Sequence, residues 1–74
     1  MITHNKLVSP KKLHVLSIVS ATKNITQAAQ QLCLSQPALS NNLSSLEQYF
    51  NCKLYEVIGR EVILTEAGKN ALAH

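Results

Sequence analysis

Apolar residues recur every three or four positions through most of this 74-residue chain, and the period shortens to two near its end. The sharpest repeat predicts a helix from about residue 36 to 50, with one narrow apolar stripe made of Leu39, Leu43, Leu46 and Phe50. Small uncharged side chains fill the opposite face: Pro37, Asn41, Ser44 and Gln48, flanked by Ser40 and Ser45. A plain solvated helix usually carries Lys and Glu there. The pattern therefore predicts a helix that packs on one side and exposes an uncharged surface on the other.

Two shorter helices are predicted before this one. Ser9-Pro10 is a helix-start signal, and the first helix ends at about Thr22, with an apolar stripe formed by Leu13, Leu16, Val19 and Ser20 and widened by Val15 and Ile18. Asn24 or Thr26 is suited to cap a second helix, whose apolar face is Ile25, Ala28, Ala29 and Leu32. The two alanines are small enough to let two helix axes approach closely.

A tight turn at Cys33-Leu34 joins the second helix to the third, which Ser35 is suited to cap. We expect Leu34 to fill the space between the helices. Beyond residue 53, the β-prone runs 54–57 and 62–64 predict a small hairpin with Gly59 at its tip, and Thr65 is suited to cap a fourth helix. The order helix, helix, helix, hairpin, helix predicts a mainly α fold with a small β-hairpin, which is a winged helix-turn-helix.

Twelve residues are assigned to the core alone: Leu13, Leu16, Val19, Ala28, Ala29, Leu32, Leu34, Leu39, Leu43, Leu46, Leu54 and Leu64. A chain of this length forms one domain with a thin core. Cys33 and Cys52 show no metal-binding spacing, and we expect both to be reduced thiols that act as small buried apolar residues. We find no signal peptide or membrane span, which predicts a cytoplasmic protein.

The net charge of +3 is modestly basic, and it is unevenly distributed. Residues 1–23 contain Lys6, Lys11, Lys12 and Lys23 and no acidic residue, whereas the only charged residue of the third predicted helix is Glu47. This balance is compatible with nucleic acid as a partner. No nucleophile–base set, metal cluster or phosphate-binding loop is present, so we expect neither an enzyme nor a cofactor in this chain.

Three motifs resemble the amino-terminal DNA-binding domain of LysR-type transcriptional regulators. Residues 25–32 (ITQAAQQL) are similar to the family pattern FTxAAxxL, residues 34–47 (LSQPALSNNLSSLE) to xSQPAVSxQIxxLE, and residues 53–68 to LFxRxxRxxxLTxAG. The resemblance covers residues 10–72. It implies a bacterial transcription factor in which a long linker helix pairs two subunits and an effector-binding domain follows. It divides the chain into a DNA-binding domain at 1–64 and the start of a truncated linker helix at 65–74.

The chain departs from the family pattern at four places. Lys23-Asn24 replaces a usual Gly-Ser, and Asn51 replaces a usual Gly at the end of the third helix, where asparagine still tolerates the left-handed conformation. Val57 stands where an arginine is common, which weakens the expected contribution of the wing to affinity. Asn41-Asn42 stands where a basic residue and Gln are frequent, which suggests a distinct target sequence.

Double-stranded DNA is therefore the predicted partner, with helix 36–50 in the major groove and hairpin 54–64 at the minor groove. The candidate DNA-binding residues are Thr26, Ser35, Gln36, Pro37, Ser40, Asn41, Ser44, Ser45, Arg60 and Lys11. Gln36 or Asn41 is suited to pair with adenine, and Pro37 to contact a thymine methyl. Ser40 lies on the same outward face, whereas Ser35, Ser44, Ser45, Thr26 and Lys11 are candidates for phosphate contacts and Arg60 for the minor groove. Lys6 and Lys12 are further phosphate attractors.

Two other interpretations stay open at this point. Winged helices also act as protein-interaction modules, and such a module would expose an apolar patch. A small stand-alone repressor of another winged-helix family would fold and dimerise without further chain. Under the LysR resemblance, a homodimer or tetramer is expected in the full-length protein through the linker helix.

Overall fold

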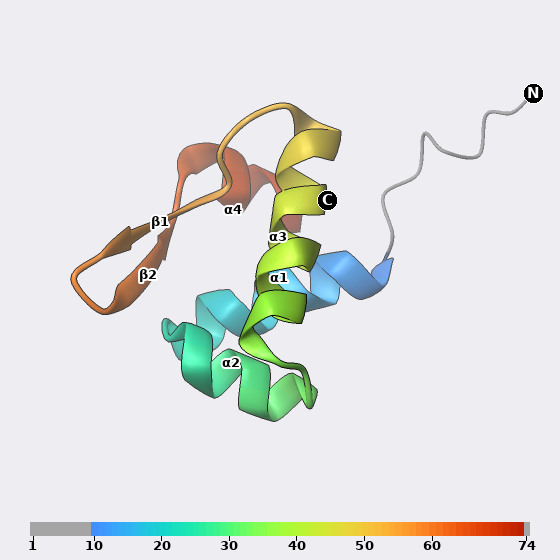
Figure 1. Cartoon of the computed structure of the whole chain (residues 1–74). Coiled ribbons are helices and arrows are strands. Elements are labelled where there is room, and N and C mark those ends of the chain that lie inside the picture. Colours follow the sequence, from blue (N-terminus) through green and yellow to red (C-terminus); the bar gives the residue numbers. More distant parts are fainter. Residues whose placement is uncertain (1–9, 74) are drawn as a thin grey trace, which may run out of the picture.

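Four helices and one two-stranded antiparallel sheet make up residues 10–73, which are the residues that the computed structural model describes (Figure 1). In chain order the elements are α1 (Pro10–Thr22), α2 (Ile25–Leu32), α3 (Gln36–Phe50), β1 (Tyr55–Ile58), β2 (Glu61–Leu64) and α4 (Glu66–Ala73). This order and the bounds of the first three helices confirm the predicted architecture. The expected cap at Ser9 lies outside the described residues.

The core lies where α1, α2 and α3 meet. The buried apolar residues are Val15, Leu16, Val19, Ala28, Ala29, Leu39, Leu43, Leu46, Leu54, Val62 and Ala71. They include eight of the twelve predicted core residues, and the other four, Leu13, Leu32, Leu34 and Leu64, are half-buried against them. Ala28 is fully buried, as expected where two helix axes approach closely. Phe50 continues the stripe of α3 at the edge of the core and is half-buried.

Capping residues fix the ends of α2 and α3. The Asn24 side chain accepts a hydrogen bond from the Gln27 N–H at 2.9 Å, and the Ser35 hydroxyl accepts one from the Ala38 N–H at 3.2 Å. Both helices end at a residue in the left-handed conformation, Cys33 with φ 57° and Asn51 with φ 59°. Asn51 therefore takes the left-handed conformation that was expected of it. The turns before and after α3 are fixed by residues close to them in the sequence.

The wing is a hairpin closed by Gly59 and Arg60. Its register pairs Tyr55 with Leu64 and Ile58 with Glu61. Relative to the prediction, β1 lies one residue later and β2 begins one residue earlier, so Ile58 and Glu61 belong to strands rather than to the turn. Gly59, at φ 65°, is in the first position of a two-residue turn. Glycine is favoured there because the twist of such turns matches the twist of the strands.

Helix α4 packs on α1 and β2 and closes the base of the wing. The Thr65 hydroxyl caps it by accepting a hydrogen bond from the Gly68 N–H at 3.1 Å, as predicted. Gly68 and Ala71 face the core and are buried. The predicted division between a domain at 1–64 and a linker start at 65–74 stays a prediction.

Both cysteines are exposed, so the prediction that they are buried was wrong. Cys33 ends α2, and Cys52 follows the residue that ends α3. A chain that leaves a helix runs over the surface, and this location outweighs the usual tendency of cysteine to be buried. Their interpretation as free thiols agrees with the structure.

Candidate nucleic-acid interface

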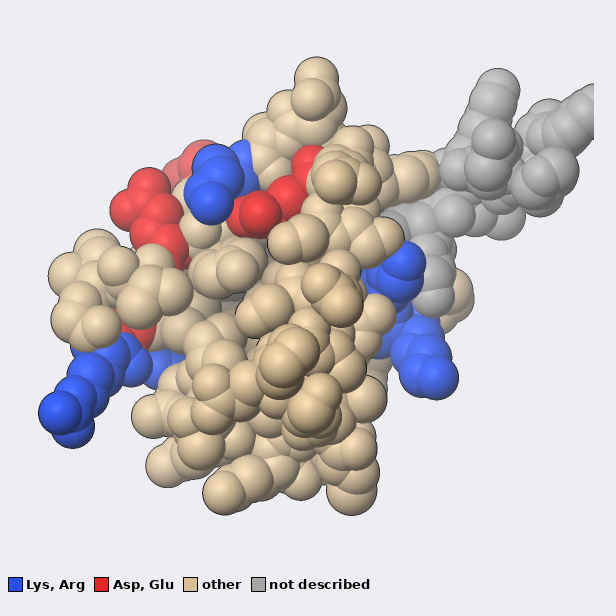
Figure 2. Space-filling model, in the orientation of Figure 1, with Lys and Arg blue, Asp and Glu red and all other residues tan. Residues whose placement is uncertain are grey.

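The outward face of α3 is polar, exposed and uncharged. Its exposed residues are Gln36, Pro37, Ser40, Asn41, Ser44 and Gln48. In Figure 2 this helix runs through the centre of a face without charged side chains over its lower part. A helix with short side chains fits the major groove of B-DNA, which is about 12 Å wide. The arrangement leaves amides and hydroxyls as the groups that can form hydrogen bonds with base edges.

The starts of α2 and α3 are joined by a hydrogen bond. The Gln36 side-chain amide donates to the Thr26 hydroxyl at 3.1 Å, across the turn of the helix-turn-helix. Both residues are exposed, and Ser35 next to them is engaged as the helix cap. Three predicted site residues are therefore brought together at one end of α3, where free backbone N–H groups favour anions.

Ser45 lies to the side of this face, toward α1. It is half-buried, and its hydroxyl accepts a hydrogen bond from the Lys12 ammonium at 2.6 Å. Next to this contact, a cavity of about 370 Å³ between α1 and the helix-turn-helix is lined by Lys11, Lys12, His14, Val15, Leu32, Leu34 and Asn42. Lys11 and Lys12 of α1 therefore lie along one edge of α3. Lys12 and Ser45 were both named from the sequence, but the hydrogen bond between them was not predicted.

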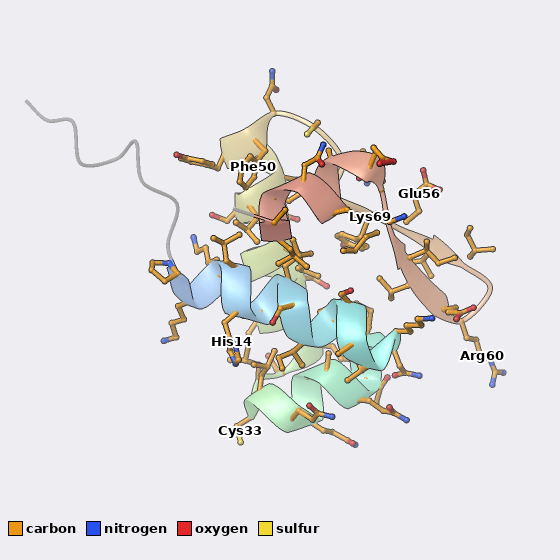
Figure 3. All side chains as sticks on the ribbon, turned by 180° about the vertical axis from the view of Figure 1, so that it is seen from behind. His14, Cys33, Phe50, Glu56, Arg60 and Lys69 are labelled. Atoms are coloured by element: carbon orange, nitrogen blue, oxygen red, sulfur yellow. The ribbon has the colours of Figure 1, made fainter. Side chains whose placement is uncertain are left out.

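Arg60 lies at the tip of the wing and points away from the body of the domain (Figure 3). It is exposed, and it follows Gly59 in the turn. In Figure 2, Lys and Arg side chains lie over the start of α1 on one side of the uncharged face, and cationic and acidic side chains lie together over the wing on the other side. The predicted site residues are therefore divided among a central uncharged face, the cationic start of α1 and the tip of a wing of mixed charge.

Glu47 is a residue of this region that the site prediction missed. It is half-buried on α3, and its carboxylate accepts a hydrogen bond from the Leu54 N–H at 2.9 Å. The contact joins the outward-facing helix to the start of the wing. Its sequence signals were that a single acidic residue interrupts an otherwise uncharged helix and that it is the last residue of the motif at 34–47.

Two other kinds of site are absent from the described residues. Within residues 10–73, no three His, Cys, Asp or Glu side chains gather in a way that would hold a metal ion. No helix in that range combines the length and the hydropathy needed to cross a membrane.

The exposed helix α3, the tight turn before it and the hairpin after it define the winged helix-turn-helix class. The sequence profile described as "Bacterial regulatory helix-turn-helix protein, lysR family" matches residues 10–69. The chain belongs to this family. The resemblance stated from the three motifs is thereby confirmed, and with it the interpretation of the fold.

Curated relatives are transcriptional regulators. The RuBisCO operon transcriptional regulator of Allochromatium vinosum is 42% identical over 62 residues, which cover 84% of this chain and 20% of that protein. The transcriptional activator CmpR of Synechocystis is 38% identical over 61 residues, which cover 82% of this chain and 20% of that protein. The chain thus spans about a fifth of the length of these two relatives.

Solved structures of similar fold include complexes with DNA. The structure described as "Crystal structure of CbnR_DBD-DNA complex" matches with a TM-score of 0.82 and 29% identity, over 89% of this chain and 76% of that chain. A complex of the BenM DNA-binding domain with benA site 1 DNA matches with a TM-score of 0.81 and 29% identity, over 89% and 77% of the two chains.

Proposed function

We propose that this domain binds double-stranded DNA in a sequence-specific manner, as the DNA-binding part of a bacterial transcriptional regulator. The observation that carries the proposal is the uncharged exposed face of α3, which lies between the lysines of α1 and the wing that carries Arg60 at its tip (Figure 2). The lysines of α1 and Arg60 attract the phosphate backbones. The neutral face of α3 can approach the bases without removing water from a charged side chain. Solved DNA complexes of domains with this fold support double-stranded DNA as the partner.

Base recognition is assigned to the first two turns of α3. Asn41 is exposed at the middle of the outward face, and its amide can pair with adenine through one donor and one acceptor. Gln36 is held at the helix start by Thr26, which limits the directions its amide can take. Pro37 and Ser40 lie on the same exposed surface and are suited to a thymine methyl and a base edge.

Phosphate contacts are assigned to the edges of α3. Thr26, Ser35 and Ser44 are exposed hydroxyls near it, and Lys11 is exposed on α1. Ser45 acts together with Lys12, because a hydroxyl that accepts from an ammonium keeps its own hydrogen for a phosphate oxygen. These contacts fix the position of the domain on the duplex and carry no sequence information directly.

Exposed apolar side chains do not favour the protein-interaction alternative. The large ones are Val57, Ile58 and Ile63 on the wing and Tyr49 near the end of α3. The wing residues flank the tip that carries Arg60, and the outward face of α3 from Gln36 to Gln48 exposes none of them.

Arg60→Ala is expected to weaken binding mainly on duplexes with A·T-rich flanks, by about 1 kcal/mol, because a narrow minor groove concentrates negative potential around an inserted arginine. The measurement is fluorescence anisotropy with two duplexes that share a central site and differ in the A·T content of the flanks. An equal loss on both duplexes would show that Arg60 contacts the backbone without sensing groove width.

The proposal is tested by NMR titration of the labelled domain with a palindromic A·T-rich duplex at two salt concentrations. Chemical-shift changes are expected at residues 26, 35–45 and 58–61, and the affinity is expected to fall at the higher salt concentration, where counterion release contributes less. Absence of shift changes at low salt would exclude this mode of binding. A single domain is expected to bind with a Kd of about 1 µM or weaker.

For the longer protein, we infer a homodimer or tetramer in the cytoplasm that engages two half-sites. These relatives are about four times as long as this chain, and the additional length is enough for the linker helix and the effector-binding domain that the family resemblance implies. Two linked domains raise the effective concentration of the second contact and account for tight operator binding by individually weak domains.

A further inference from the structure

A chain of hydrogen bonds joins α3, the wing and α4 at one residue, Leu54. Its N–H donates to the Glu47 carboxylate at 2.9 Å, and its carbonyl accepts from the Thr65 N–H at 3.0 Å. The Thr65 hydroxyl in turn donates to the Lys53 carbonyl at 2.7 Å. Leu54 itself is 1% exposed, so its backbone groups need protein partners. The start of β1 is therefore fixed from both sides.

Of these hydrogen bonds, the one between the Leu54 N–H and Glu47 of α3 involves a charged side chain. A carboxylate that accepts from an N–H forms a bond about twice as strong as a neutral one. Burial, together with the negative charge of Glu47, also raises the pKa of the neighbouring Tyr55 phenol above its usual value. A negative charge on a helix that enters DNA is unfavourable, because it repels phosphates. Glu47 thus combines an electrostatic cost for binding with a structural contact to the wing.

The second strand of the wing is held by a different part of the helical body. The Val62 N–H donates to the Lys23 carbonyl at 3.1 Å, and Lys23 takes a left-handed conformation with φ 56° in the turn between α1 and α2. The start of β1 is therefore held to α3 through a side chain, and β2 is held to the turn between α1 and α2 through the backbone. These two ties determine how the hairpin projects from the domain (Figure 1).

We propose that Glu47 is a positioning residue that sets the orientation of the wing relative to α3. Through this orientation, it fixes the separation between the side chains assigned to the major groove and Arg60 at the minor groove. The inference rests on the proposed DNA binding for its functional consequence, whereas the orientation itself is a property of the domain without DNA.

Two substitutions separate position from charge. Glu47→Gln and Glu47→Ala both remove the negative charge, but only glutamine keeps an oxygen that can accept from the Leu54 N–H. If the charge alone mattered, both variants would bind DNA more tightly than the parent. If the hydrogen bond matters, Glu47→Ala binds DNA more weakly than the parent, whereas Glu47→Gln does not.

The orientation is measured on the free domain by pulsed electron paramagnetic resonance. One spin label is attached to the native Cys33 in the helix-turn-helix and the second to the wing through Ile58→Cys, with Cys52→Ser in the background, since all three positions are exposed. The parent and Glu47→Gln are expected to give one narrow distance distribution, and Glu47→Ala a broader or shifted one. A distribution for Glu47→Ala that coincides with the parent overturns the proposal.

A shorter carboxylate supplies a second variant if alanine lowers the melting temperature below the temperature of the assay. Glu47→Asp keeps the charge and withdraws the carboxylate by one CH₂ group, so that it no longer reaches the Leu54 N–H, which lies 2.9 Å from the glutamate oxygen. The same broadening of the distance distribution is expected, with the helical content unchanged by circular dichroism. A narrow parental distribution in Glu47→Asp counts against the proposal.

The functional consequence is measured by combining Glu47 variants with Arg60→Ala. In the parent and in Glu47→Gln, Arg60→Ala is expected to lower affinity for an A·T-flanked duplex about fivefold. In Glu47→Ala the further decrease is expected to be below about twofold, since the arginine of a misplaced wing no longer reaches the minor groove. Equal decreases in all three backgrounds overturn the proposal. Failure of every form to bind DNA would contradict the proposed function, and the distance measurement would still decide the positioning role.

Discussion

Gly68→Ala is expected to lower the free energy of unfolding by about 2–3 kcal/mol, because it inserts a methyl group where no space exists. A Cβ at this position would lie 2.0 Å from the Leu54 carbonyl oxygen, 3.0 Å from its carbon and 3.3 Å from the Leu64 side chain. Two of these three atoms belong to backbone that cannot rotate away. Helix α4 must therefore shift away from the base of the wing.

The higher helix propensity of alanine favours the variant, but it is too small to make Gly68→Ala stabilising. Alanine is favoured over glycine inside a helix by about 1 kcal/mol, which offsets part of the cost of overpacking. The remaining loss is about half of the ~5 kcal/mol expected for a domain of this size. Urea denaturation followed by circular dichroism at 222 nm measures it. A variant as stable as the parent would show that α4 can move without loss of packing.

Gly59→Ala is the matched control, since it makes the same chemical change at the only other glycine of the sequence. Nothing lies within 4 Å of the position of its Cβ, but the residue has φ 65°. The expected cost is backbone strain alone, about 1 kcal/mol, confined to the wing. The two variants together separate steric exclusion from conformational preference.

The extent of α3 was predictable because several local signals agree. Ser35, the leucine period and Asn51 each indicate the same helix, and its bounds of Gln36 to Phe50 follow from residues adjacent in sequence. The exposure of the face around Asn41 follows from the same period. A long, strongly periodic helix is the feature that sequence patterns define best.

The contacts that connect elements were not predictable in the same way. Lys12 and Ser45 are 33 residues apart, and the Val62 N–H donates to the carbonyl of Lys23, which lies in the turn between α1 and α2. Such pairs depend on how the helices pack, and no local pattern encodes them. The exposure of Cys33 was missed for a related reason, because an average burial preference of cysteine says nothing about a particular helix end.

Asn41→Asp is expected to lower affinity for the specific duplex at least about 100-fold while the fold stays intact. The carboxylate has nearly the shape of the amide, but it lacks the N–H that would donate to adenine N7. It also places a negative charge on the helix face that enters the groove between the two phosphate backbones. Asn41 is exposed, and no core packing depends on it. The duplex for the measurement is one selected in vitro from random sequences with the parent domain, and affinity is measured by fluorescence anisotropy.

Alanine at the same position distinguishes lost recognition from added repulsion. Asn41→Ala removes the paired amide without adding charge, so it is expected to reduce discrimination by about 1–3 kcal/mol and to leave binding to random DNA nearly unchanged. Asn41→Asp weakens binding to both kinds of duplex, because repulsion by phosphates is independent of sequence. Asn70→Asp makes the same chemical change on the exposed side of α4, outside the proposed interface, and the decrease in affinity there is expected to be less than about twofold. Equal decreases for Asn41→Asp and Asn70→Asp would mean that net charge alone governs binding, and that α3 does not enter the groove with its polar face.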